Sequence, residues 1–319
     1  MKIAVLALEG VFDSGIAIVL DALHTANELS KVSGIQTPGF DIVVVGVRPR
    51  VQSALGFQVP VVDAAEVSAP DWVMVPAIGY KMPDTLVPAL ARDDIPDAAA
   101  ALRRWSDQGA RIAAACVGTF VVAESGLLDE QEATTTWWLT PLFKQRYPRV
   151  RLDANRIIVP SGKVLTAGAA FSHIDLALWL IRHHSPELAA LVAKYLVVDA
   201  RPSQASYMIA DHLAHADPLV EGFDRWARER LDAPINLDAA AGALATSKRT
   251  LSRRMQAVLG KTPLEYVQDL RVERAVHLLK TSSHSVDRIA ALVGYADGVT
   301  LRTLLRKRLG RGVRELRAQ

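Results

Sequence analysis

Two features that would restrict the function of this chain are almost absent from its sequence. It has one cysteine, Cys116, in 319 residues, and no apolar run approaches the roughly 20 residues that a membrane-spanning helix needs. One cysteine cannot form an intrachain disulfide, which suits a reducing compartment. The first eight residues have the form of a buried strand rather than of a signal peptide. Since no metal-binding cluster or phosphate loop occurs either, we expect a soluble, cytoplasmic protein without a cofactor.

Charge is divided unevenly along the chain. The formal net charge is only +3, but residues 237–319 contain 16 Lys and Arg against 7 Asp and Glu, whereas residues 1–236 contain 21 against 27. The two parts therefore carry +9 and −6. Such asymmetry is expected when one domain meets a polyanion and the other does not; a solvated basic face without a partner is the alternative. The length and the hydrophobic content of 50% allow two domains.

The first two hundred residues alternate short apolar runs with stretches of helical periodicity. The runs are residues 2–8, 41–47, 72–75 and 111–115, and the helical stretches include residues 16–29 and 98–108. Strands buried on both faces that alternate with helices are typical of a mostly parallel sheet covered on both faces. A hairpin formed by residues 156–159 and 164–167 and a helix over 172–183 are expected to follow. We predict an α/β, flavodoxin-like fold.

Cys116 directly follows the apolar run 111–115 and precedes Gly118 and a helical stretch that extends through Ala123. A strand, a nucleophile-type residue, a glycine and a helix form the layout of a nucleophile elbow, which holds a side chain at the carboxyl edge of a sheet. The helix N-terminus is expected to lower the pKa of the thiol. In this interpretation Cys116 faces a pocket; the alternative is that it is a small buried hydrophobic residue.

The segment 112–137, IAAACVGTFVVAESGLLDEQEATTTW, resembles the PfpI-like, class I glutamine-amidotransferase-like superfamily and, within it, the regulatory GlxA-type branch. That branch has a Cys-x-Gly elbow, a helix, an Ala-Gly-Leu-Leu-like segment and a Thr-Thr-His-Trp-like segment. Residues 165–180, LTAGAAFSHIDLALWL, resemble its Thr-x-Ala-Gly…Asp-Leu region. The resemblance covers about residues 1–195 and implies a PfpI-like fold.

The chain departs from the enzymatic members of this superfamily at three positions. A nucleophilic cysteine needs a base and usually a nearby carboxylate. By the resemblance, the residue after the cysteine, His in the proteolytic and amidase-like members, is Val117, and the branch's His before Trp is Thr136. The carboxylate near the first strand corresponds to Gly15, with Asp13 and Glu9 as the only close substitutes.

His173 is the one histidine in a plausible neighbouring segment, and it approaches Cys116 if the loop at Gly168 and Ala169 lines the same cleft. A lone histidine at a helix start is more often capped or at the surface, and we expect that here. We therefore predict a binding pocket without turnover, and no enzyme.

Ligands of such sheets bind in the crevice beyond the carboxyl ends of the strands. The backbone N–H groups of Val117 and Gly118 are suited to an anionic or carbonyl group of a ligand. The candidate ligand-binding residues are Glu9, Gly10, Ala77, Ile78, Gly79, Cys116, Val117, Gly118, Trp137, Gly168 and Ala169.

Residues 187–231 have helical periodicity rather than the composition of a flexible linker. Residues 199–204 interrupt it and look like the stretch that joins the two domains of GlxA-type regulators. A helix over 218–231 places Leu219, Phe223, Trp226 and Ala227 on one face. Two roles are open for that face: it packs against the sheet domain, or it forms a dimer or domain contact.

Near its end the sequence repeats itself at an offset of 50. The recurring residues are Thr250, Leu251, Leu259, Gly260 and Glu265, found again as Thr300, Leu301, Leu309, Gly310 and Glu315, and Ala240-Ala241, found again as Ala290-Ala291. The first copy is expected to form helices over 238–245 and 248–259, and the second over 286–292 and 299–309. A capping box at residues 262–265 starts a spacer helix over 263–280. The repeat predicts an all-α domain with two helix-turn-helix motifs that bind DNA.

Residues 235–317 resemble the AraC-type DNA-binding domain. The residues that carry the resemblance are Leu244-Ala245, Ser247, Arg249-Thr250-Leu251, Arg253-Arg254, residues 259–263, Tyr266, Leu270-Arg271, Glu273-Arg274-Ala275, Leu278-Leu279, Ile289-Ala290 and Gly294-Tyr295. The second copy departs from the pattern: Leu301 and Leu305 stand where aromatic residues are frequent, and Gly312-Val313 replaces the usual final x-Pro.

Recognition helices read base edges with their outward N-terminal residues, and two such helices on a rigid spacer enter successive major grooves about 34 Å apart. Arg249, Ser252 and Arg253 are the expected base readers of copy one. The candidate DNA-binding residues are Lys248, Arg249, Thr250, Ser252, Arg253, Val299, Thr300, Arg302, Thr303, Arg306 and Lys307. In copy two Val299, Arg302 and Thr303 face bases, and Thr300, Arg306 and Lys307 face phosphates, so that copy one supplies most of the discrimination.

These patterns predict a sequence-specific transcriptional regulator that binds double-stranded promoter DNA, responds to a small-molecule effector and forms a homodimer. Residues 1–195 form the sensor or dimerisation domain, 196–234 a helical connector and 235–319 the DNA-binding domain. Two alternatives stay open: a cysteine-dependent hydrolase, hydratase or amidase fused to a DNA-binding domain, and a sheet domain that serves only dimerisation.

Overall fold

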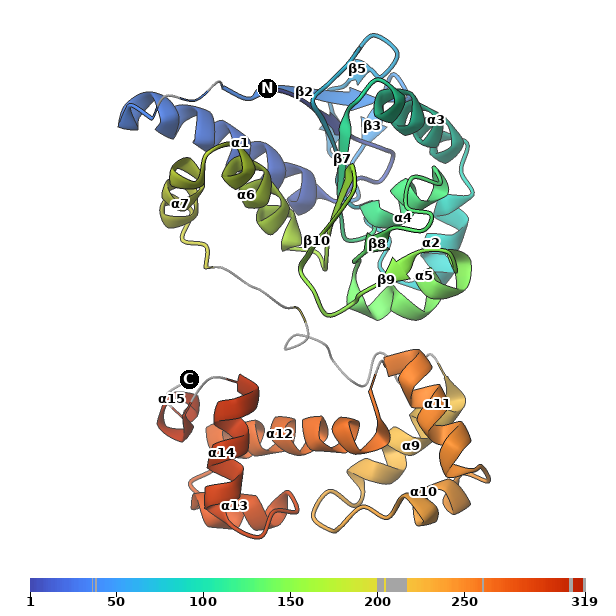
Figure 1. Ribbon diagram of the computed structural model, residues 1–319, viewed down its shortest axis with the longest axis vertical. Helices are drawn as coiled ribbons and strands as arrows, with labels where there is room; N and C mark the ends of the chain where they lie inside the picture. Colours follow the sequence, from blue (N-terminus) through green and yellow to red (C-terminus); the bar gives the residue numbers. More distant parts are fainter. Residues whose placement is uncertain are drawn as a thin grey trace. The chain divides into compact units, whose positions relative to one another are not determined.

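The computed structural model describes residues 1–35, 37, 39–199, 204, 217–259, 261–309 and 312–317, without the side chains of Lys307 and Leu309. The chain divides into two compact units, Met1–Tyr207 and Met208–Gln319 (Figure 1). Most of the connecting stretch predicted from residues 199–204, the helix-ending Gly260 and Gly310, and the side chain of Lys307 lie outside the described residues.

The first unit is an α/β unit. Its strands are β1 (Lys2–Leu6), β2 (Asp41–Gly46), β3 (Val51–Gln52), β4 (Gln58–Val59), β5 (Val62–Asp63), β6 (Trp72–Val75), β7 (Arg111–Ala115), β8 (Glu132–Ala133), β9 (Arg151–Leu152), β10 (Ile158–Ser161) and β11 (Val164–Ala167). Its helices are α1 (Asp13–Ser33), α2 (Pro83–Leu90), α3 (Asp94–Asp107), α4 (Gly118–Glu124), the 3-10 turn η1 (Trp137–Leu139), α5 (Thr140–Arg146), α6 (Ser172–His184) and α7 (Pro186–Tyr195).

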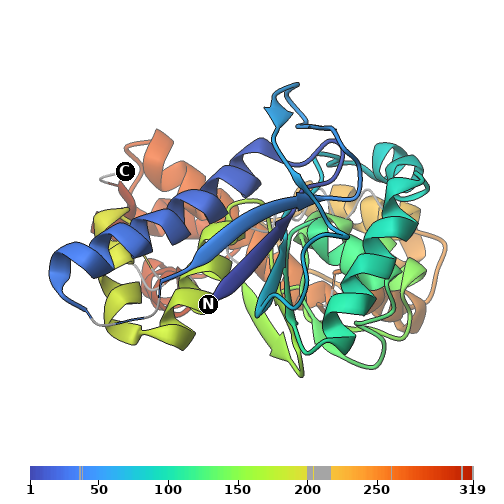
Figure 2. The same cartoon turned by 90° about the horizontal axis from the view of Figure 1, so that it is seen from above.

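The main sheet has seven strands in the order β10-β11-β7-β6-β1-β2-β5. All neighbouring strands are parallel except β10 and β11, which form the predicted antiparallel hairpin. Helices α1, α6 and α7 lie on one face and α2 to α5 on the other (Figure 2). The predicted fold class is therefore confirmed, and the parallel strands bring their carboxyl ends to one edge.

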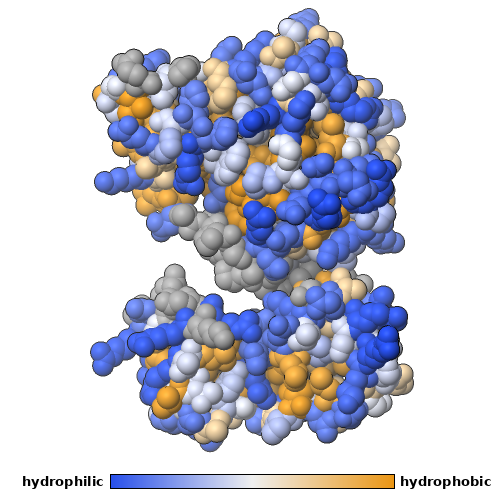
Figure 3. Space-filling model, viewed as in Figure 1, coloured by the Kyte–Doolittle hydropathy of each residue, from blue (hydrophilic) through white to orange (hydrophobic). Residues whose placement is uncertain are grey.

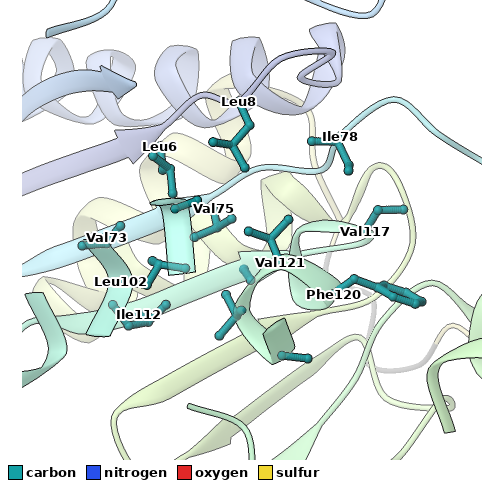
Figure 4. Packing of buried hydrophobic residues seen from close by; sticks show 14 of the residues in the cluster. Leu6, Leu8, Val73, Val75, Ile78, Leu102, Ile112, Val117, Phe120 and Val121 are labelled. Atoms are coloured by element: carbon teal, nitrogen blue, oxygen red, sulfur yellow. The ribbon is translucent and has the colours of Figure 1, made fainter. Parts of the chain in front are cut away.

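Alternate residues of each central strand enter different cores, as strand geometry requires. Leu6 and Val73 belong to the core under α3 and α4, together with Leu102 and Phe120 (Figure 4). Ile3 and Val5, which point to the other face of β1, belong to the second core beneath α1, α6 and α7. Because both faces are buried, the strands show in the sequence as continuous apolar runs.

The second unit is all-helical. Its described helices are α9 (Pro218–Arg228), α10 (Leu237–Ala243), α11 (Lys248–Leu259), α12 (Pro263–Thr281), α13 (Val286–Leu292), α14 (Gly298–Leu309) and α15 (Val313–Arg317). Both predicted helix-turn-helix motifs are present, and the capping box of Thr262 and Glu265 starts α12 as predicted. Leu301 and Leu305 are fully buried in the core of the second motif, so leucine fills these positions without an aromatic ring. Polar side chains dominate the visible face of each unit, with apolar side chains in patches between them (Figure 3).

Helix α9 packs against the first helix-turn-helix motif. It contacts α10 and α11, and Phe223 is fully buried beside the ring of Tyr266. The hydroxyl of Tyr266 donates a hydrogen bond to the buried carboxylate of Asp224 at 2.6 Å, and Asp217, which caps α9, pairs with Arg254. These contacts make α9 part of the second unit.

The two helix-turn-helix motifs are related by two different offsets. The second helices, α11 and α14, start 50 residues apart, whereas the first helices, α10 and α13, start 49 apart. The structural counterparts of the buried Ala240 and Ala241 are therefore Ile289 and Ala290, and the alignment of Ala240-Ala241 with Ala290-Ala291 is wrong by one residue. The turn of the second motif is one residue longer.

Candidate functional site

Cys116 occupies a strained turn between β7 and α4. Its φ of +55° lies in the left-handed region, which is unusual for a residue with a side chain and typical of nucleophile elbows. The turn is tight because α4 starts against β6: a Cβ on Gly118 would lie 2.3 Å from the carbonyl oxygen of Val75. The structure thus contains the elbow predicted from the Cys-x-Gly spacing.

The expected activation of the thiol is not found. Cys116 is 4% exposed, and burial raises the pKa of its thiol to about 12. A hydrogen bond from the Val117 N–H, the hydroxyl of Thr136 and the charge of Lys81 each lower that pKa, but desolvation outweighs them. The prediction that the N-terminus of α4 stabilises a thiolate is therefore wrong. A thiol with this pKa is almost entirely protonated at neutral pH.

His173 is buried, contrary to our expectation of a capped or surface residue. Its Nε2 accepts a hydrogen bond from the backbone N–H of Ala77 at 3.1 Å, and its Nδ1 donates to the carbonyl oxygen of Ala170. Burial lowers the pKa of the ring to about 4. Since both nitrogens are occupied by backbone groups, the ring has no free nitrogen with which to take a proton from Cys116.

Gly15, which stands where the enzymatic relatives have a carboxylate, leaves space for the ring of His173. A Cβ on Gly15 would lie 2.7 Å from Nε2 of His173, so the imidazole fills the space that a longer side chain at residue 15 would need. The substitutes are also engaged: Asp13 accepts hydrogen bonds from the Ser53 hydroxyl and the Leu55 N–H, and Glu9 accepts one from the Gln52 N–H.

The predicted ligand-binding residues all lie at the carboxyl edge of the sheet, where hydrogen bonds join several of them. Gly79 donates to the carbonyl oxygen of Gly10 at 2.7 Å, which brings the loops after β1 and β6 together. The N–H of Cys116 donates to Ala167, next to Gly168. Glu9 is exposed, whereas Ala77, Ile78, Cys116, Val117, Gly118, Trp137 and Gly168 are buried. A groove of about 620 Å³ lies elsewhere, between the end of α1 and the start of α7.

One residue that the sequence did not single out is central to this edge. Gln204 lies between the two predicted domains, yet its side chain is inserted into the first unit and is 2% exposed. Its Nε2 donates to the carbonyl oxygens of Thr135 at 3.0 Å and Ala154 at 2.8 Å, and its Oε1 accepts from the Ala169 N–H at 2.9 Å. Nothing in a stretch of small and polar residues distinguishes a glutamine that is buried by contacts made far along the chain.

The outer face of α11 carries the predicted copy-one residues. Lys248, Arg249 and Arg253 are exposed, Thr250 and Ser252 are half-buried, and Leu251, Met255 and Leu259 face the core. Lys248 pairs with Asp238 at 2.9 Å. Within the described part of the chain, no carboxylate pairs with Arg249 or Arg253.

The outer face of α14 is arranged similarly. Val299, Thr300, Arg302, Thr303 and Arg306 are all exposed. Asp297 accepts a hydrogen bond from the Thr300 N–H at 2.7 Å, which fixes the start of the helix. Among the described side chains, none forms an ion pair with Arg302 or Arg306. Both guanidinium groups are therefore available to an anionic partner.

The fold and the turn at Cys116 place the first unit in the class of flavodoxin-like sheets with a strand–cysteine–helix elbow, joined here to a paired helix-turn-helix unit. Residues 1–183 match the DJ-1/PfpI family, and residues 240–319 match a helix-turn-helix domain family. The first match covers more than half of the sequence, and the chain belongs to the DJ-1/PfpI family. Both resemblances inferred from the motifs, PfpI-like and AraC-type, are confirmed.

The chain is also similar to named regulators. It is 26% identical over 200 residues to the HTH-type transcriptional regulator GbdR of Pseudomonas aeruginosa, covering 61% of this chain and 54% of GbdR. It is 25% identical over 202 residues to the HTH-type transcriptional regulator GlxA of Rhizobium meliloti, covering 61% of each. The chain thus spans little more than half the length of these relatives.

The crystal structure of an AraC family transcriptional regulator from Pseudomonas putida aligns with a TM-score of 0.51 at 20% identity, covering 61% of this chain and 98% of that one. At this identity the likeness shows the fold alone. In the described part of the chain, no helix is both long and apolar enough to cross a membrane.

Proposed function

We propose that this protein is a sequence-specific DNA-binding transcriptional regulator whose DJ-1/PfpI unit binds a small molecule without converting it. The observation that carries the proposal is the outward face of α11, where Arg249 and Arg253 are exposed and unpaired with any described carboxylate, while the opposite face is buried. Free guanidinium groups near the start of a second helix in a helix-turn-helix are suited to guanine O6 and N7.

The second motif supports an unequal division of labour. Val299 is 66% exposed and is suited to a thymine methyl group, while Arg306 lies further along α14 and suits a phosphate. Arg302 and Thr303 are exposed on the same face, although the hydroxyl of Thr303 already donates to the Val299 carbonyl oxygen. We propose that copy one supplies most of the sequence discrimination.

The chemistry around Cys116 supports binding without turnover. A protonated thiol, a histidine with both nitrogens occupied and a glycine at the carboxylate position lack the base and the activated nucleophile that cysteine catalysis needs. A ligand that reaches the thiol must displace side chains that cover it. The hydroxyl of Thr140, at the end of η1, is buried without a hydrogen-bond partner among the described residues, which supports a polar ligand.

We further propose that the protein acts as a homodimer in the cytoplasm, with residues 1–195 as the sensor domain and 235–319 as the DNA-binding domain. The similarity to named regulators and the single cysteine support this arrangement.

The DNA-binding proposal is tested by selecting duplexes from a random pool with the full chain and measuring Kd for the selected sequence and for single-base variants. Arg253→Ala should cost about 1–3 kcal/mol and relax preference at one base pair. Arg306→Ala should weaken all sequences alike and reduce the salt dependence of binding. A chain that selects no sequence contradicts the proposed function, and a uniform loss with Arg253→Ala contradicts its role as a base reader.

The effector proposal is tested by a thermal-shift screen of the full chain against amines, amides and amino-acid derivatives, with product formation checked for every compound that raises Tm. Cys116→Ala and Trp137→Ala should each reduce the shift without unfolding the protein, and Gln145→Ala, on the exposed side of α5, serves as the control. Unchanged shifts in both variants contradict the location of the site, and product formation contradicts binding without turnover.

A further inference from the structure

Gln204 lies between α7 and α9, and both its backbone and its side chain are hydrogen-bonded to the first unit. Its backbone N–H donates to the carbonyl oxygen of Asn155 at 2.9 Å, in addition to the side-chain bonds to Thr135, Ala154 and Ala169. A glutamine amide has two N–H donors and one carbonyl acceptor. All of them are used here, by backbone groups from three separate segments.

The first unit is shaped to receive this side chain. A Cβ on Gly168 would lie 2.5 Å from Oε1 of Gln204 and 2.7 Å from its Cδ. Any larger residue at position 168 would occupy the space of the amide. Gly168 itself donates to the carbonyl oxygen of Ile157 at 2.8 Å, so its backbone is not free to retreat. The close approach shows a fitted contact rather than a side chain lying loosely on the surface.

Two hydrogen bonds connect Gln204 to the cysteine elbow. Gln204 donates to the carbonyl oxygen of Thr135, and the hydroxyl of Thr135 donates to the carbonyl oxygen of Cys116 at 2.6 Å. The next residue, Thr136, lies beside the thiol and lowers its pKa. On the other side, Gln204 holds the N–H of Ala169, which is among the proposed ligand-binding residues.

We infer that Gln204 is a latch that couples the candidate effector site to DNA binding: movement of Thr135–Thr136 or Gly168–Ala169 when a ligand enters releases the amide and, with it, the chain that leads to α9. This inference rests on the proposed function, because it concerns the regulation of the same site. A ligand shifts such an equilibrium only by binding one state better than the other, and an amide that hydrogen-bonds to four backbone groups and to the Thr134 hydroxyl is either inserted with these bonds or released without them.

The test uses the full chain with its selected duplex and two variants that release the latch from opposite sides. Gln204→Ala removes the amide, and Gly168→Ala fills the space into which it inserts. Each should change Kd for the duplex by about fivefold or more, in the same direction. Because both release one contact, the double variant should show no further change. Gln145→Ala and Gly39→Ala are the matched controls, since residue 145 is exposed and a Cβ at residue 39 meets only Asn27, at 3.4 Å.

Hydrogen exchange of the wild-type full chain gives a readout that does not depend on the variants folding. The amides of Ala169 and Gln204 should be protected, and Gln204→Ala should speed exchange at Ala169 while leaving β1 unchanged. Unprotected amides in the wild type, unchanged Kd in either variant, or additive changes in the double variant would each overturn the latch. A wild-type chain that selects no duplex contradicts the regulator itself, and the exchange of Ala169 then still decides whether Gln204 is inserted.

Discussion

The buried imidazole of His173 makes the stability of the first unit depend on pH in a way that one substitution should remove. Burial lowers the pKa of the ring from its ordinary value of 6.5 to about 4 in the folded state. The unfolded chain therefore binds a proton at this residue as the pH falls through 6.5, while the folded chain stays neutral until about 4. Stability from this group is fully present above 6.5 and is lost as the pH falls toward 4.

The size of the effect follows from the shift. One pKa unit corresponds to about 1.4 kcal/mol, so His173 should lower the free energy of unfolding by about 2 kcal/mol between about pH 7.5 and pH 5, and by about 3 kcal/mol when the loss is complete. In His173→Gln the amide keeps an acceptor for the Ala77 N–H and a donor for the Ala170 carbonyl oxygen but binds no proton. The pH-dependent part contributed by residue 173 should disappear.

The assay is urea denaturation of the wild type and His173→Gln at both pH values, followed by tryptophan fluorescence. The quantity to compare is the change in the free energy of unfolding between the two pH values. Acidic groups elsewhere contribute equally to that change in both proteins, so the difference between the proteins comes from residue 173. His24→Gln, which removes an exposed histidine from α1, should keep the wild-type change. If His173→Gln loses as much stability on acidification as the wild type, the imidazole is not held neutral by burial and the interpretation of its hydrogen bonds is wrong.

Three further predictions concern packing, capping and ion pairing, each measured by urea denaturation. Gly118→Ala should lower the free energy of unfolding by about 3 kcal/mol, because the new Cβ meets the Val75 carbonyl oxygen at 2.3 Å. Gly242→Ala, which meets nothing within 4 Å inside α10, should instead raise it by about 0.5–1 kcal/mol; equal effects would refute the close approach. Thr262→Ala should cost about 1 kcal/mol through loss of the capping box, and no cost would show that the cap is not formed in solution. Asp269→Asn, which removes ion pairs at 2.8 and 3.3 Å, should cost about 1 kcal/mol at low salt and less at high salt; a salt-independent cost would indicate packing instead.

The parts of the fold that sequence predicts best are those set by local periodicity. The runs 72–75 and 111–115 coincide with β6 and β7, and the helices over 248–259 and 286–292 have the predicted bounds, because burial on one or both faces leaves a pattern in neighbouring residues. The runs 2–8 and 41–47 extend beyond β1 and β2, since the chain stays apolar after it leaves the sheet. The turn at Cys116 was predictable from spacing because a glycine is needed where α4 meets β6.

The properties that were not predicted depend on contacts between distant residues. His173 is buried because Gly15, 158 positions earlier, leaves room for its ring. The pKa of Cys116 is set by how completely the surrounding core excludes water, which no local motif records. Gln204 donates to the carbonyl oxygen of Thr135, which lies 69 residues before it. The repeat misled at Ala240-Ala241 because identical residues match at an offset of 50, whereas the buried positions of α10 and α13 match at an offset of 49.

The unequal turns of the two helix-turn-helix motifs bear on how the specificity of such a protein is redesigned. Helices α11 and α14 each contain 12 residues, and the extra residue of the second motif lies before α14 rather than within it. Helix α11 (248–259) and helix α14 (298–309) can therefore replace one another whole, while each motif keeps its own turn and first helix. A graft placed one residue out of register would rotate its side chains by about 100° around the helix axis and bring the buried leucines of the helix toward its outer face.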